Sequence, residues 1–166
     1  MMRTGILVAG FVAMVGVFAQ AADSSLSAEA NAAFLVANAK KPGVVVEPSG
    51  LQHRTIHTGF GKRPSGTDLV TVNYKGTLIN GKVFDATEPG LPAQFTVNKL
   101  IPGWTEALKL MREGDQWELV IPADLAYGAH GAGGVIPPNQ SLVFDLQLIS
   151  VSPAPKEQKS DQDQSQ

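Results

Sequence analysis

The stretch Val120–Phe144, VIPADLAYGAHGAGGVIPPNQSLVF, contains the most informative segment of this sequence. Two strand-like ends enclose a long connection rich in Gly and Pro, whereas connections in compact domains usually span about 4–6 residues. Tyr127, Val135 and Ile136 lie inside it, and a loop that keeps apolar side chains either buries them or offers them to a ligand. We therefore expect a binding loop on a scaffold. The alternative is a turn whose apolar residues only plug the edge of the core.

The composition is typical of one globular domain with tails, since 43% of the 166 residues are apolar and 17% are charged. The formal net charge of -2 gives no basic footprint for nucleic acid or an anionic membrane surface. The absence of cysteine excludes disulfides, thiolate catalysis and Cys-ligated metals. His53, His57 and His130 have no companions at ligand spacing, so we expect them to face solvent and predict neither a metal site nor a cofactor.

The N-terminus has the pattern of a cleavable secretory signal peptide. A basic start, Met1–Arg3, precedes the apolar run Gly5–Phe18, and Ala19-Gln20-Ala21 matches the small-x-small cleavage pattern. The apolar run is shorter than the roughly 20 residues of a membrane span. We predict cleavage after Ala21 and a periplasmic or secreted mature chain that is not bound to a membrane. An uncleaved anchor is the alternative.

After this segment, Ser27–Lys40 is expected to form a short amphipathic helix. Ser27 is a suitable N-cap, and Pro42-Gly43 ends the pattern. The apolar positions follow the spacing i, i+3, i+4, i+7, and they are Ala30, Ala33, Phe34 and Ala37. A helix this short is marginal alone, so we expect this face to dock on the main domain or on a second copy.

Three later segments alternate apolar and polar residues with the period of half-buried strands. The expected inward residues are Val70, Val72 and Tyr74, then Trp117, Leu119 and Ile121, then Leu142, Phe144, Leu146 and Leu148. Asn80-Gly81 is a hairpin signal, so Thr77–Leu78 should pair with Val83–Phe84. A further short strand is expected within Val44–Leu51, which ends in the turn Pro48-Ser49-Gly50.

One helix interrupts these strands. Pro102 suits the first helical turn, and Gly114 suits the C-terminal stop. The apolar stripe between them consists of Trp104, Ala107, Leu108 and Met111. One short helix against several antiparallel strands is an α+β arrangement.

Four motifs in this order carry a family resemblance. They are VTVNYKGTLINGKVFDA (70–86), LIPGWTEALKLMREGD (100–115), ELVIPADLAYG (118–128) and GVIPPNQSLVFDLQL (134–148). The region 50–151 resembles the FK506-binding protein (FKBP) type of peptidyl-prolyl cis-trans isomerase. Residues 31–52, NAAFLVANAKKPGVVVEPSGLQ, resemble the junction that precedes this domain in the bacterial secreted group related to macrophage infectivity potentiator (Mip). The resemblance implies a twisted antiparallel sheet wrapped around one short helix, with a ligand pocket between them.

The resemblance also implies roles for individual residues. Trp104 would form the pocket floor, and Asp85 and Tyr127 would be the polar, catalytic edge. The other substrate-binding residues would be Tyr74, Phe84 and Phe144 as aromatic walls, Leu100 and Ile101 before the floor, and Val135 and Ile136 from the long loop. The sequence departs from eukaryotic members after Asp85. Segment 86–94 is shorter, and Ala93 falls where an extra pocket aromatic often lies.

Each of these residues has a structural alternative. Tyr74 and Phe144 on strands, and Trp104 on the helix, occupy inward positions where filling the core is the ordinary role. Asp85 could lie in a surface turn. If it is buried in its apolar segment, however, its carboxylate needs a hydroxyl partner, which Tyr74 or Tyr127 could supply.

An aromatic cluster with a single carboxylate suits the chemistry of proline isomerisation. Rotation about an X-Pro bond is slow because the C–N bond is partly double, with a barrier of about 18–20 kcal/mol. A dry pocket disfavours the charge-separated planar amide relative to the twisted transition state. Raising the uncatalysed rate of about 0.01 per second to ordinary turnover requires only about 4–7 kcal/mol, with no nucleophile or metal.

We therefore predict an isomerase that acts on X-Pro bonds of unfolded or exported polypeptides and that macrolides of the FK506/rapamycin type inhibit. The alternatives are a proline-segment-binding chaperone with little turnover and a virulence-associated surface protein of the same fold. The N-terminal helix is too small to offset the roughly 4–15 kcal/mol that association costs, so we predict a monomer. The expected divisions are a signal peptide (1–21), a helical segment (22–43), the isomerase domain (44–152) and a disordered polar tail (153–166).

Overall fold

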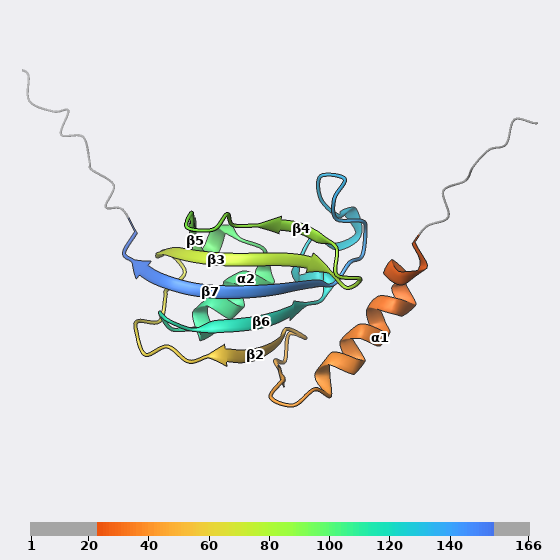
Figure 1. Cartoon of the computed structure of the whole chain (residues 1–166), viewed down its shortest axis with the longest axis horizontal. Helices are drawn as coiled ribbons and strands as arrows, with labels where there is room; N and C mark the ends of the chain where they lie inside the picture. The colour runs from red at the N-terminus through yellow and green to blue at the C-terminus, as the bar shows by residue number, and fades with distance from the viewer. Residues whose placement is uncertain (1–22, 155–166) are drawn as a thin grey trace, which may run out of the picture.

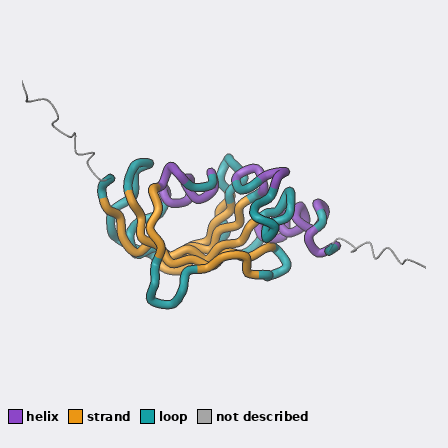
Figure 2. Tube along the Cα trace, turned by 90° about the horizontal axis from the view of Figure 1, so that it is seen from above, coloured by secondary structure: helices purple, strands orange, loops and turns teal. Residues whose placement is uncertain are grey.

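Seven antiparallel strands form one curved sheet in the computed structural model, which describes residues 23–154 (Figures 1 and 2). The strands are β1 (Val45–Val46), β2 (Gln52–His57), β3 (Leu69–Leu78), β4 (Val83–Ala86), β5 (Ala93–Thr96), β6 (Gln116–Ile121) and β7 (Leu142–Ser152). The helices are α1 (Ala28–Ala39) and α2 (Pro102–Leu110), with 3-10 turns η1 (Ser24–Leu26), η2 (Val97–Lys99), η3 (Ala123–Leu125) and η4 (Gly128–His130). The predicted signal peptide and residues 155–166 of the predicted tail lie outside the described residues. Within residues 23–154, no helix is both long enough and apolar enough to cross a membrane.

The strand order is β1-β2-β6-β7-β3-β4, and β5 also pairs with β3. Strand β7 lies at the centre and is paired over most of its length with β6 and β3. The hairpin predicted at Asn80-Gly81 joins β3 to β4, with Thr77 opposite Val83. The α+β prediction, with an antiparallel sheet wrapped around one short helix, is confirmed. The strand expected within Val44–Leu51 contains only β1, which pairs with the start of β2.

Helix α2 lies against the concave face of the sheet, and its predicted stripe is buried. Gly103 allows this close approach, because a Cβ atom there would lie 2.5 Å from Cγ2 of Ile121 on β6. The stop predicted at Gly114 was wrong, since α2 ends at Leu110. Gly114 instead occupies the turn before β6 with φ +93°, a conformation that glycine adopts without strain.

Helix α1 is present, with Ser27 as its N-cap, but its predicted docking face is only partly covered. Ala30 and Phe34 are half-buried and Ala33 and Ala37 are exposed, whereas the buried residues of α1 are Asn31 and Asn38. The polar face docks because the surface it meets is polar: the end of the long loop and the side chain of Gln52. Buried amides and backbone groups require hydrogen-bond partners, which alanine and phenylalanine cannot supply.

Four hydrogen bonds fix α1 along its length. Near its start, Asn31 Nδ2 donates to Gln140 Oε1 at 3.1 Å, and the Ser141 backbone N–H donates to Asn31 Oδ1 at 2.8 Å. Near its end, Asn38 Nδ2 donates to Gln52 Oε1 at 2.9 Å, and Gln52 Nε2 donates to the Leu35 carbonyl at 3.0 Å. Helix α1 is therefore folded back onto its own domain beside one end of the sheet (Figure 1).

We expect Asn31→Leu to lower the free energy of unfolding by about 2–4 kcal/mol, because it leaves the Gln140 amide oxygen and the Ser141 N–H buried without partners. Urea unfolding measures this change. Ala33→Leu, on the exposed face of the same helix, is the matched control and should stay within about 0.5 kcal/mol of the wild type. Equal stability of the two variants would contradict the docking described above.

Candidate functional site

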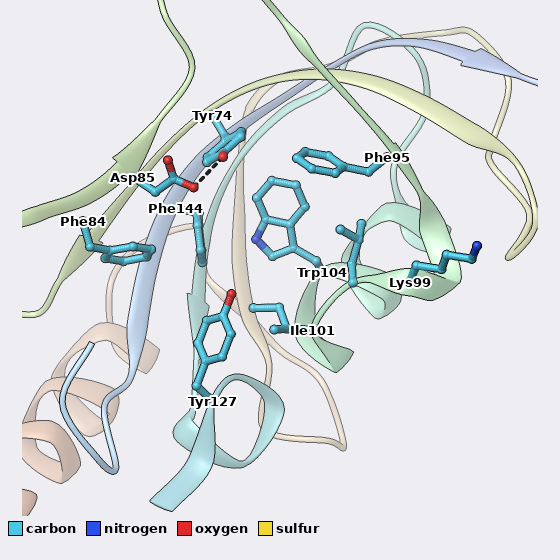
Figure 3. Close-up of a pocket in the computed structure, with 10 residues that line it drawn as sticks. Tyr74, Phe84, Asp85, Phe95, Lys99, Ile101, Trp104, Tyr127 and Phe144 are labelled. Atoms are coloured by element: carbon cyan, nitrogen blue, oxygen red, sulfur yellow. Dashed lines mark hydrogen bonds between the residues drawn. The ribbon is translucent and has the colours of Figure 1, made fainter. Parts of the chain in front are cut away.

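A cavity of about 450 Å³ lies between the sheet and the start of α2. Figure 3 shows its lining, which consists of Tyr74, Phe84, Asp85, Phe95, Lys99, Leu100, Ile101, Trp104, Tyr127 and Phe144. These side chains come from β3, β4, β5, β7, the η2–α2 junction and the long loop. The fold therefore gathers residues that are far apart in the sequence around one apolar space.

Trp104 forms the floor of this cavity and is only 4% exposed. Three aromatic rings meet it nearly perpendicularly, with centroid distances of 5.1 Å for Tyr74, 5.9 Å for Phe95 and 5.2 Å for Phe144. Such edge-to-face pairs are each worth about 0.5–1.5 kcal/mol beyond the burial of their area. The indole is therefore held in one orientation by its neighbours.

The start of α2 is also fixed, which places Trp104. Pro102 occupies the first helical turn, where its missing N–H leaves no hydrogen bond unmade. Thr105 Oγ1 donates to the Val97 carbonyl at 2.7 Å and ties the helix to η2. Trp104 Nε1 is buried and has no hydrogen-bond partner within residues 23–154. Figure 3 shows this nitrogen on the side of the indole that faces Phe144.

The opposite wall is the pair Phe84 and Phe144, which pack edge-to-face with centroids 5.5 Å apart. Gly76 on β3 lies beneath both rings. A Cβ atom at Gly76 would come within 2.6 Å of Phe84 Cζ and 2.7 Å of Phe144 Cε1. This wall therefore requires glycine at position 76, which the sequence motif supplies.

The polar edge is built around a short hydrogen bond from the Tyr74 hydroxyl to Asp85 Oδ2, at 2.6 Å. Asp85 lies within β4 and is exposed at the cavity mouth, so the surface-turn alternative was wrong. Burial, together with the hydrogen bond to Asp85 and its negative charge, raises the pKa of Tyr74 well above its ordinary value. The hydroxyl therefore stays protonated through neutral pH and acts as a donor that orients the carboxylate.

Tyr127 supplies a second hydroxyl from the long loop between η3 and η4. Its side chain is 42% exposed, and its hydroxyl makes no hydrogen bond in the described part of the chain. Figure 3 shows this hydroxyl directed toward the interior of the cavity. Of the two tyrosines considered as partners of Asp85, the structure selects Tyr74.

Two residues predicted for the site, Val135 and Ile136, are not part of the cavity lining. A bridge between Ala132 and Ile136 closes a tight turn at the tip of the long loop. This turn leaves Val135 49% exposed and directs Ile136, 5% exposed, into the core. Neither lines the cavity. Ile136 thus fits the alternative of a residue that plugs the core, whereas Tyr127 does not.

Two residues that line the cavity, Phe95 and Lys99, were not predicted from the sequence. Phe95 lies opposite Val70, and Ala93 lies opposite Val72, so both are on the same face of β5. The extra aromatic that Ala93 lacks is therefore present two positions later, and alternation in this short strand could have indicated it. Lys99, at the end of η2, is exposed at the cavity rim and had no signal in the sequence.

The prediction that the histidines face solvent was correct for His57 and His130, which are exposed. It was wrong for His53, which is buried and stacks on Trp117 with a centroid distance of 4.2 Å. Its Nε2 lies 2.8 Å from Glu47 Oε1. No cluster of three His, Cys, Asp or Glu residues that could hold a metal occurs among residues 23–154.

We expect Trp104→Ala to lower the free energy of unfolding by about 3–5 kcal/mol, because the floor of the cavity is also part of the core. Chemical unfolding followed by circular dichroism measures the loss. Phe60→Ala removes an aromatic side chain that is 91% exposed and serves as the control, with a change within about 0.5 kcal/mol. A loss below about 1 kcal/mol for Trp104→Ala would show that the indole is not packed as described.

Comparison with known proteins agrees with this geometry. The family model described as FKBP-type peptidyl-prolyl cis-trans isomerase matches residues 61–149. The model described as the domain amino terminal to FKBP-type peptidyl-prolyl isomerase matches residues 14–55. Among solved structures, FkpA from Escherichia coli aligns with a TM-score of 0.72 and 46% identity, over 75% of this chain and 59% of that chain. A peptidyl-prolyl cis-trans isomerase from Pseudomonas syringae pv. tomato aligns with a TM-score of 0.71 and 41% identity, over 75% and 92%.

Curated relatives give the same result. The outer membrane protein MIP of Legionella longbeachae is 58% identical over 123 residues, which are 74% of this chain and 53% of the relative. The FKBP-type 22 kDa peptidyl-prolyl cis-trans isomerase of Escherichia coli is 53% identical over 119 residues, which are 71% of this chain and 58% of the relative. The chain thus spans little more than half the length of these relatives. It belongs to the FKBP-type peptidyl-prolyl cis-trans isomerase family and resembles the Mip-like members.

Proposed function

We propose that the protein catalyses cis-trans isomerisation of X-Pro peptide bonds in the aromatic cavity. The observation that carries this proposal is an apolar cavity of about 450 Å³ with Trp104 as its floor and a carboxylate held at its edge by Tyr74. A proline ring is apolar and compact, so it suits a floor and walls made of aromatic rings. The polar amide bond beside the ring would then lie at the cavity edge, near Asp85 and Tyr127.

The same arrangement explains how rotation is accelerated. The planar amide is charge-separated and well hydrated, whereas the twisted transition state has less charge separation. Removing water from around the bond therefore disfavours the planar form relative to the twisted form. Trp104 and the Phe84–Phe144 wall exclude water from the side of the proline ring. No covalent step is needed, because the bond only rotates.

The polar groups hold the twisted geometry. The Tyr127 hydroxyl donates to the carbonyl oxygen of the bound peptide, and the Asp85 carboxylate, fixed by Tyr74, provides negative charge at the mouth of the cavity. Both groups are already positioned in the free protein, so no free energy is spent on reorganising them during the reaction. Asp85 and Tyr127 are accordingly the proposed catalytic residues, with Tyr74 positioning Asp85.

The sequence favours export of the protein from the cytoplasm. The signal peptide predicted for residues 1–21 would direct the chain to the periplasm or beyond, and a relative from Legionella longbeachae is named an outer membrane protein. Its substrates would then be proline-containing exported polypeptides before they fold. Macrolides of the FK506 type would occupy the same apolar cavity and compete with them. The chaperone and virulence alternatives require the fold but not the polar edge, so turnover separates them from an isomerase.

We expect Asp85→Leu and Tyr127→Phe each to lower kcat/KM by about 5- to 150-fold, because loss of one positioned polar group at the cavity edge costs about 1–3 kcal/mol in the transition state. A protease-coupled assay or NMR exchange on a short X-Pro peptide measures this change. Asp124→Leu, which changes an exposed carboxylate outside the cavity, is the matched control and should keep wild-type turnover. Peptide binding without turnover in the wild type would favour the chaperone alternative instead.

We also infer that the 166-residue chain is monomeric at micromolar concentration. The face of α1 that could pair with a second copy is mostly alanine, with Val36 as its most exposed large side chain. Its burial contributes too little to offset the roughly 4–15 kcal/mol cost of association. Light scattering should give one chain mass across a tenfold dilution. A mass of two chains that falls to one for Val36→Lys would contradict this inference.

A further inference from the structure

A second cleft, of about 500 Å³, lies at the other end of α2 from the aromatic cavity. The aromatic cavity uses residues at the start of the helix, whereas this cleft uses Leu110 at its last turn and Arg112 just beyond. The loop after β2 forms its outer wall with Phe60 and Arg63, and Trp117 on β6 forms its inner wall. None of these residues lines the aromatic cavity.

The outer wall presents an aromatic ring to solvent. Phe60 is 91% exposed, the highest exposure among the large apolar side chains of residues 23–154. This exposure follows from a fixed backbone. The N–H of Gly59 donates to Asp115 Oδ1 at 2.6 Å, and a Cβ atom at Gly59 would collide with the Glu113 carbonyl. The loop is therefore held against the α2–β6 turn with Phe60 outside, as in surfaces that bind apolar groups.

The cleft carries excess positive charge. Arg63 and Arg112 are exposed, and neither forms an ion pair within residues 23–154. Asp115 is the only carboxylate in the lining, and it already accepts the backbone N–H groups of Gly59 and Arg112 at 2.6 and 2.7 Å. Arg112 Nη1 donates to the Gly61 carbonyl at 3.3 Å. The cleft thus contains two guanidinium groups and one carboxylate, and that carboxylate already accepts two hydrogen bonds. A ligand with one negative charge would balance the remaining positive charge.

The adjoining edge of the sheet is unpaired. Strand β1 covers only Gln52 and His53 of β2, so the outer edge of 54–57 has no strand partner in the described part of the chain. Thr55, on this stretch, lines the cleft. An open strand edge offers backbone N–H and C=O groups to an extended chain. The edge therefore favours a polypeptide over a small anion as the occupant.

We propose that this cleft binds an extended peptide segment that carries one carboxylate next to an apolar side chain. The carboxylate lies between Arg63 and Arg112, the apolar side chain packs against Phe60 and Leu110, and the peptide backbone follows the open edge of β2. Binding here needs no proline and no isomerase activity, so the proposal stands apart from the function of the aromatic cavity.

The test uses a peptide without proline, acetyl-Ala-Glu-Phe-Ala-amide, added to the ¹⁵N-labelled full chain. The two tryptophans report on the two sites separately, since Trp117 lines the cleft and Trp104 lines the aromatic cavity. We expect saturable shifts of the Trp117 indole N–H and the Gly59 amide, with the Trp104 indole N–H unchanged. The same peptide with Gln in place of Glu should bind about tenfold more weakly, because it lacks the charge-assisted hydrogen bonds.

Variants then locate the binding groups. Arg63→Glu and Phe60→Ala change exposed side chains and should each weaken binding about tenfold or more. Lys82→Glu makes the same change of charge at an exposed position in the β3–β4 hairpin and should bind as the wild type does. Three results would overturn the proposal: no saturable shift, equal affinity of Arg63→Glu and Lys82→Glu, or the same Trp117 shift with sodium acetate alone. A shift of Trp104 in place of Trp117 would also overturn it, because the peptide would then occupy the aromatic cavity.

Discussion

The packing of Trp104 between α2 and the sheet is the interaction on which the rest of the structure depends. Three rings meet the indole edge-to-face, and two of them, Tyr74 and Phe144, come from adjacent strands at the centre of the sheet. The contact is possible because Gly103 lets α2 approach β6 within a distance that no larger residue would allow. One side chain therefore closes the core and forms the floor of the cavity, so the stability of the fold and the shape of the cavity depend on the same contacts.

The polar edge is separate from this packing. Asp85 is exposed on β4, and Tyr127 lies on the long loop, so neither contributes a buried side chain to the core. A change at either position therefore alters the chemistry of the cavity without opening the interior. Tyr74 connects the two regions, because its ring packs on Trp104 while its hydroxyl holds the Asp85 carboxylate.

What could be predicted from the sequence was set by local periodicity. Alternation located β3, β6 and β7, and the 3.6-residue period located α2, because burial on one face imposes these patterns. The docking face of α1 could not be predicted in this way, since Asn31 is satisfied by Gln140, which is 109 positions away. The burial of Val135 and Ile136 could not be predicted, because a tight turn, not the apolar character of the pair, decides which of them enters the core. Lys99 reaches the cavity rim only through the tertiary position of η2.

The same buried amides link α1 to the loop that carries Tyr127. Asn31 accepts the N–H of Ser141, and Gln140 Nε2 donates to the Pro138 carbonyl at 3.0 Å. The next residue toward the loop, Asn139, donates its N–H to the Gly128 carbonyl at 2.8 Å, directly after Tyr127. Each step is a hydrogen bond to backbone, so the position of the loop base follows the position of α1. Helix α1 is therefore part of the frame that positions the Tyr127 hydroxyl at the cavity, although none of the side chains of α1 lines the cavity.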